Sequence, residues 1–108
     1  MGAPENFLVP VTFDLNGGDA GAHPLPIVEK CYPNGYVETS SFAGTREGYR
    51  FIEWNTKRDG TGVSYSTSQK FYIQGEEPAT LYAIWKKLLP VYVEFPYEGG
   101  LTRLPLSA

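Results

Sequence analysis

Acidic side chains that could act as general acid and general base are spread along the whole chain. Carboxylate catalysis needs two such groups close together, in environments that separate their pKa values. Here the acids fall in expected turns or on the expected solvent faces of strands, so the sequence predicts solvated charges and no catalytic residue. The acids considered are Asp14, Asp19, Glu29, Glu38, Glu47, Glu53 and Asp59.

The only histidine and the only cysteine, His23 and Cys31, could in principle serve as base and nucleophile. His23 precedes a proline in an expected loop, and nothing nearby in the sequence supplies a third group to orient it. We expect a loop histidine and a small half-buried thiol, and hence a protein that is not an enzyme.

Two short stretches resemble fragments of calcium loops: "NGGD" at residues 16–19 and "DGTG" at 59–62. Calcium takes six to eight oxygen ligands, and neither fragment has enough acids to supply them. The glycine pair at 17–18 is not followed by the Lys-Ser/Thr of a phosphate loop. The sequence therefore predicts structural turns, no metal and no cofactor.

Tryptophan and tyrosine can stack on sugar rings, but both tryptophans have the pattern of core residues. Trp85 falls on the same strand face as Leu81 and Ala83, and Trp54 follows an apolar run. The predicted structural core is Val11, Phe13, Phe51, Trp54, Leu81 and Trp85.

Three tyrosines, Tyr32, Tyr36 and Tyr72, are expected to be exposed. They are the candidate ligand or partner surface. The alternative function that they favour is a small carbohydrate-binding module.

The elements that would position these residues are short strands. The chain has 108 residues, 42% of them hydrophobic, with nine prolines and twelve glycines, which is typical of one globular domain of strands and turns. Apolar alternation predicts strands in "VPVTFDL", "YRFIEW" and "TLYAIW", and two more around a tight hairpin at 33–35. No window has a helical apolar stripe, so the predicted fold class is mainly β, α+β at most.

The charge and hydropathy of the chain argue against nucleic-acid binding and against a membrane-spanning segment. A net charge of −3 and a pI near 5.0 argue against nucleic acid, which requires a basic footprint. No apolar run approaches the roughly 18 residues of a membrane span. The N-terminal residues lack a signal-peptide pattern, and we interpret the sequence as a fragment of something larger.

A short internal match suggests a tandem array. Residues 9–18, "VPVTFDLNGG", recur as residues 91–100, "VYVEFPYEGG", at a constant offset of 82 positions. Either the match is a coincidence, or a second unit begins here with a period of about 80 residues. The expected organisation is a fragment end or linker at 1–8, a β domain at 9–86, and a linker strand at 87–108.

The C-terminal segment has three possible roles. It could pack on its own domain, which we favour, or pair with another chain and cause self-association. It could instead complete this domain, in which case the internal match is a coincidence. Pro90, Pro96 and Pro105 would confine it to a sheet edge.

Three stretches in order, "VTFDLNGG", "TREGYRFIEWNTKRDGTGVSY" and "TLYAIW", resemble the Listeria–Bacteroides repeat, the B-repeat of internalin B, over about residues 9–86. The resemblance implies a small β-grasp-like fold related to ubiquitin and SUMO, with little or no helix. It also implies tandem copies on bacterial and some archaeal surface proteins, without catalysis or cofactor.

From this resemblance we expect a cell-surface or secreted module acting as spacer and adhesion or protein-interaction element. Its partners would be proteins or cell-wall or host-surface glycans.

The chain departs from the family pattern at two places. Glu53 stands where the family usually has glycine before the tryptophan, and Ala43-Gly44 replaces the usual proline before "TREGY". For Phe51 and Trp54 both to enter the core, the strand needs an extra residue between them. We therefore predict a β-bulge at Ile52-Glu53, with the Glu53 carboxylate in solvent.

Overall fold

The computed structural model describes residues 8–89, which form seven strands and no helix. The strands are β1 (Val9–Asp14), β2 (Ile27–Cys31), β3 (Tyr36–Glu38), β4 (Tyr49–Asn55), β5 (Ser64–Tyr65), β6 (Lys70–Tyr72) and β7 (Ala79–Lys87). The predicted mainly β class is confirmed, and the reason is visible in the sequence. Glycine, proline and asparagine interrupt the chain too often for a helix, while valine, tyrosine and phenylalanine favour strands.

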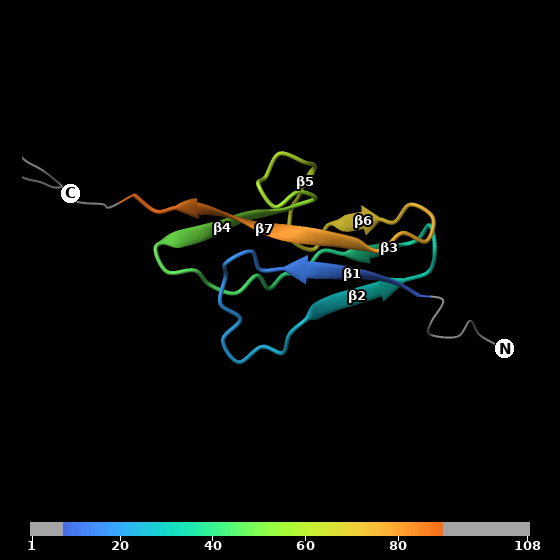
Figure 1. The fold of residues 1–108 in the computed structure, drawn as a ribbon, viewed down its shortest axis with the longest axis horizontal. Coiled ribbons are helices and arrows are strands. Elements are labelled where there is room, and N and C mark those ends of the chain that lie inside the picture. The colour runs from blue at the N-terminus through green and yellow to red at the C-terminus, as the bar shows by residue number, and fades with distance from the viewer. Residues whose placement is uncertain (1–7, 90–108) are drawn as a thin grey trace, which may run out of the picture.

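Five strands form a mixed sheet in the order β2-β1-β7-β4-β5 (Figure 1). The last of the described strands, β7, lies in the middle, parallel to β1 and antiparallel to β4. In the β1–β7 pair, Val11 lies opposite Ala79 and Asp14 lies opposite Tyr82. This order makes β1 and β7, the first and last strands within residues 8–89, neighbours in the sheet. The β-grasp relation stays a prediction.

The remaining strands, β3 and β6, pair antiparallel as a separate two-stranded sheet. Their buried side chains Val37 and Phe71 belong to the same hydrophobic cluster as β1 and β7. The centre of that cluster is Trp54, whose ring meets Phe13 edge-on at 5.0 Å between centroids. The Trp54 Nε1–H donates to the Ser40 carbonyl oxygen at 2.8 Å, so burial leaves this indole donor satisfied.

The bulge predicted in β4 is present. The β4–β7 register shifts between Phe51 and Glu53, because Phe51 lies opposite Trp85 and Glu53 opposite Ile84. The extra residue, Ile52, is exposed, while Phe51 and Trp54 both turn toward the core.

The Glu53 carboxylate, predicted to lie in solvent, keeps part of its exposure but is also held by neighbouring side chains. Glu53 is half-buried, and its Oε2 accepts hydrogen bonds from Ser64 Oγ at 2.8 Å and Asn55 Nδ2 at 3.0 Å. The neighbouring strand and loop lie close enough to bind the carboxylate, which the strand pattern alone did not indicate.

The segment around residues 33–35 contains the predicted tight turn, but its two flanking strands do not pair with each other as a hairpin. The turn is tight, with the Gly35 N–H donating to the Tyr32 carbonyl at 2.8 Å. The strands on its two sides diverge, however: β2 pairs with β1, and β3 pairs with β6. The Asn34 N–H donates instead to the Gly75 carbonyl at 3.0 Å, which joins the turn to the segment after β6.

The C-terminal copy of the repeat pattern, residues 91–100, lies outside the described residues, as do most of the predicted linker segments 1–8 and 87–108. The predicted domain of residues 9–86 falls within the described part.

Candidate functional site

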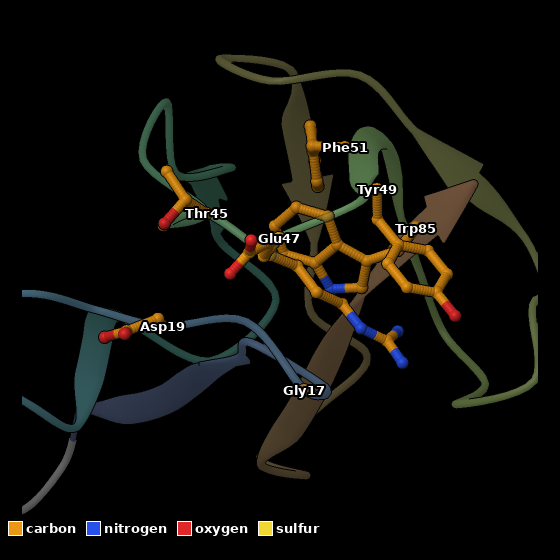
Figure 2. A pocket seen from close by; sticks show the side chains of 9 residues that line it. Gly17, Asp19, Thr45, Glu47, Tyr49, Phe51 and Trp85 are labelled. Atoms are coloured by element: carbon orange, nitrogen blue, oxygen red, sulfur yellow. The ribbon is translucent and has the colours of Figure 1, made fainter. Parts of the chain in front are cut away.

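A groove of about 490 Å³ opens at the end of the sheet where β7 ends (Figure 2). β4 and β7 continue there beyond the main core, and their inward-facing side chains Tyr49, Phe51 and Trp85 lie half-buried along it. The Phe51 and Trp85 rings meet at 5.9 Å between centroids, nearly perpendicular. The groove therefore has an aromatic floor that the core covers only in part.

Trp85 is fixed in this floor by two contacts with the turn after β1. Its Nε1–H donates to the Leu15 carbonyl oxygen at 2.8 Å. Gly18 lies directly against the indole: a β-carbon on Gly18 would lie 2.5 Å from Trp85 Cζ2. Any larger residue at position 18 would therefore displace the ring.

The polar wall of the groove comes from residues 44–47. The Arg46 guanidinium lies 3.9 Å from the centre of the Tyr49 ring, a cation–π arrangement. Thr45 is held by a backbone bridge to Asp19, with its N–H 3.0 Å from the Asp19 carbonyl oxygen. Asp19 and Glu47 add exposed carboxylates at the rim (Figure 2).

The backbone at the replaced family proline requires glycine. Gly44 has φ +76°, which a proline cannot adopt, and a β-carbon there would collide with the Asp19 carbonyl. The departure from the family pattern at 43–44 thus fits the bridge between Asp19 and Thr45.

The polar loop at 56–63 is organised by a single buried side chain, Asn55. Its Oδ1 accepts the N–H groups of Lys57 and Gly62, both at 2.9 Å. Its Nδ2 donates to Glu53 Oε2 at 3.0 Å and to the Gly60 carbonyl at 3.2 Å. Although Asn55 is on the outer face of the sheet, opposite Tyr82, the loop covers it completely.

The same loop packs onto the outer face of the sheet. The Arg58 guanidinium lies 4.8 Å from the centre of the Tyr82 ring and 3.8 Å from the Asp14 carboxylate. Gly60 lies against Ile84. Exposed ion pairs of this kind contribute little to stability, so the buried Asn55 is the stronger attachment.

The two calcium-loop fragments are hydrogen-bonded turns. Asp59 Oδ1 accepts the Thr61 hydroxyl at 2.7 Å and the Thr61 N–H at 3.1 Å, and these bonds lower the pKa of Asp59. Asp19 Oδ1 accepts the Gly21 N–H at 2.8 Å. Within residues 8–89, no three histidine, cysteine or acidic side chains gather as metal ligands would.

Of the three candidate tyrosines, the structure brings two together. Tyr36 and Tyr72 lie opposite each other in the β3–β6 pair, with ring centroids 5.4 Å apart and a tilt of 47°. The Lys70 ammonium lies 4.9 Å from the Tyr36 ring centre. Tyr32 is exposed in a different place, beside Pro33 and Glu76.

The two candidate nucleophilic residues occupy unlike environments. His23 is exposed and stacks on Phe42 at 4.2 Å. Cys31 is a free thiol at the end of β2, buried in the hydrophobic cluster, and burial raises its pKa. A thiol with a raised pKa is a poor nucleophile.

The residues predicted to form the core differ in how deeply the structure buries them. Val11, Phe13, Trp54 and Leu81 are buried, whereas Phe51 and Trp85 are half-buried and line the groove. The residues that sequence reasoning missed are Arg46, Tyr49 and Asn55. For Asn55 a signal existed, since an asparagine directly after a core tryptophan begins a glycine-rich turn.

Comparison with known proteins identifies one matching family and two similar proteins that are much longer than this chain. The model of a family described as the Listeria-Bacteroides repeat domain matches residues 10–84. Two proteins of Evansella cellulosilytica are similar to the chain. One, named "Putative Gly-rich membrane protein", is 38% identical over 91 residues, covering 83% of this chain and 10% of that protein.

The other, named "Putative membrane protein", is 39% identical over 75 residues, covering 69% of this chain and 11% of that protein. The chain thus spans about a tenth of the length of the curated relatives it matches. Among residues 8–89 there is no helix, and so none that could cross a membrane.

Proposed function

Since the chain belongs to the Listeria-Bacteroides repeat domain family, we propose that it is a non-enzymatic module that separates and positions other parts of a long surface or secreted protein. The observation that carries the proposal is topological. The chain enters β1 at one end of the sheet and leaves β7 at the opposite end (Figure 1). A unit with this connectivity adds its own length to the protein that contains it.

Three further observations support the same role. The relatives are about ten times longer than the matched segment, so such a unit is a small part of a large protein there. Their printed names call them membrane proteins, which favours placement at the cell surface or outside the cell. The internal match between residues 9–18 and 91–100 fits a tandem arrangement of such units.

Within this role, the Trp85 groove is the surface we propose for contact with a protein partner. Its floor is aromatic, and its rim carries Arg46 beside the carboxylates of Asp19 and Glu47. Aromatic residues and arginine are enriched at the centres of protein interfaces. A partner segment with an apolar side chain between charged ones fits this lining.

Carbohydrate binding by the tyrosines has less support. A sugar ring stacks on a flat, open aromatic face. The Tyr36 and Tyr72 rings are tilted by 47°, and Lys70 lies over the Tyr36 ring. This pair therefore offers a ridged surface in place of one flat face.

The spacer role is tested by small-angle X-ray scattering on one, two and four joined copies of the chain. We expect the maximum dimension to increase by a constant amount per copy. Light scattering on the single chain, beside a version that ends at Lys87, should give monomers of equal thermal stability. Copies that collapse without adding length would overturn the proposal. Glycan titration with Tyr72→Ala as control tests the carbohydrate alternative.

A further inference from the structure

The position of β1 beside β7 has a mechanical consequence, and it rests on the proposed spacer function. We infer that this domain is a load-bearing element, in which the β1–β7 seam resists a pull applied through the two ends of the chain. In a spacer, tension reaches the domain at Val9 and leaves it at Lys87. Because β1 and β7 are parallel neighbours, this pull slides the two strands along each other in opposite directions (Figure 1).

Sliding loads the backbone hydrogen bonds of the pair together, whereas peeling would break them one at a time. The pairs from Val11–Ala79 to Asp14–Tyr82 would have to yield in one step. Within the five-stranded sheet, the other strands do not bypass the seam. β2 pairs only with β1 in the sheet, and β4 and β5 lie on the far side of β7. The seam therefore divides the sheet into an N-terminal and a C-terminal half. The β3–β6 pair of the second sheet is a separate connection between the N-terminal and C-terminal parts of the chain.

Hydrogen bonds between the turn after β1 and the C-terminal half extend the seam beyond its last backbone pair. Asn16 Nδ2 donates to the Ala83 carbonyl at 2.9 Å and to the Arg58 carbonyl at 3.0 Å. Trp85 Nε1 donates to the Leu15 carbonyl at 2.8 Å. These bonds all cross from the N-terminal half to the C-terminal half, and we call them the latch.

The latch also explains the composition of the turn at 15–18. Asn16 has φ +51°, a conformation that asparagine tolerates better than most residues, and Gly18 makes room for the Trp85 indole. The turn is thus shaped to bring its side chain and carbonyl groups onto β7. A turn that only reversed the chain would need no such contacts.

The test is single-molecule pulling on the whole chain in two geometries. Handles at the two termini load the seam by sliding. Handles on cysteines introduced at Ala22 and Lys87, in a Cys31→Ala background, pull from the same end of β1 and β7 and peel them apart. At equal loading rate we expect the rupture force to be at least about twofold higher for sliding. Equal forces, or a weaker sliding geometry, would overturn the inference.

A matched pair of variants locates the resistance in the latch. Asn16→Gly removes two bonds across the seam and keeps a backbone that accepts positive φ. Asn34→Gly is the same substitution at another positive-φ position, where the Asn34 Oδ1 bond from the Gly75 N–H lies away from the seam. We expect Asn16→Gly to shorten the lifetime under constant sliding force about tenfold, and Asn34→Gly to change it little.

Trp85→Phe serves as a second seam variant if Asn16→Gly does not fold, as judged by circular dichroism. Equal lifetimes for seam and control variants would overturn the role of the latch. The scattering experiment separates this inference from the spacer role. If joined copies add length but unfold at low force, the spacer proposal stands and the load-bearing inference fails. If joined copies resist force but add no length, only the spacer proposal is contradicted.

Discussion

The Trp85 indole N–H donates a 2.8 Å hydrogen bond to the backbone carbonyl of Leu15, which joins two segments 70 positions apart. Gly18, three residues further along, lies against the same ring. The "NGG" turn after β1 and Trp85 in β7 are therefore in contact. This contact closes the β1–β7 seam and forms the floor of the groove, so one residue serves both stability and the candidate surface.

A double-mutant cycle on Gly18 and Trp85 tests this contact. Gly18→Ala places a methyl group against Trp85 Cζ2 and should lower the free energy of unfolding by about 1–3 kcal/mol. Trp85→Phe removes the donor to Leu15 and should cost about 1–2 kcal/mol. Because the smaller phenyl ring leaves space for the methyl group, the double variant should cost less than the sum. Urea unfolding measures all three; strict additivity would contradict the contact.

Removing the side chain that organises the 56–63 loop should be more costly than its polar character suggests. Asn55→Ala leaves the N–H groups of Lys57 and Gly62 without their acceptor in a covered site. We expect a loss of about 2–3 kcal/mol in the free energy of unfolding. Hydrogen exchange at these two amides should also accelerate.

The control for this loop is Ser64→Ala, which removes an exposed hydroxyl that donates to Glu53 at 2.8 Å and accepts a longer bond, at 3.4 Å, from Asn55 Nδ2. Its cost should stay within about 0.5 kcal/mol. If Asn55→Ala cost no more than this control, the loop would be held by other contacts, such as Arg58 with Tyr82.

Strand patterns predicted much of the fold because alternation reports directly on burial. Val9, Val11 and Phe13 alternate with half-buried neighbours and are buried as the pattern indicates. The bulge in β4 was also predictable, since two aromatic residues of one strand had to reach the same core. Such information is local, and it fixes which face a residue occupies.

Which strands pair with each other was harder to predict from the sequence. Pro33-Asn34-Gly35 fits a hairpin turn, yet β2 and β3 join different sheets, because β3 buries Val37 by pairing with β6. Similarly, the groove arises because β4 and β7 extend past the second sheet, which leaves Phe51 and Trp85 half-buried. Both features depend on the relative lengths of elements distant in sequence, and a single strand's pattern does not contain them.

The Asp59 turn predicts a local pH effect. The Thr61 hydroxyl and N–H, in that order, hold the pKa of Asp59 below its ordinary value of 3.8. Because the pKa of Asp59 is lower in the folded than in the unfolded protein, the turn adds to folding stability at any pH above the unfolded-state pKa. This stabilisation is lost as the pH falls through the folded-state pKa. An NMR titration that follows the side-chain carboxyl carbon of Asp59 should show the low pKa, and Thr61→Ala should raise that pKa toward the ordinary value. An unchanged pKa in Thr61→Ala would contradict the assignment.

Cys31 offers a chemical probe of the edge strand β2. Its thiol is buried and its pKa lies above the ordinary value of 9.0, so little thiolate is present or accessible at pH 8. A disulfide reagent should therefore label it at least about a hundredfold more slowly in the native protein than in urea. Ala22→Cys in a Cys31→Ala background, which places the thiol in an exposed loop, should label natively at nearly the unfolded rate. Fast native labelling of Cys31 would mean that β2 separates readily from β1. The N-terminal half of the sheet would then open on its own, and resistance to tension would depend on the β1–β7 seam alone.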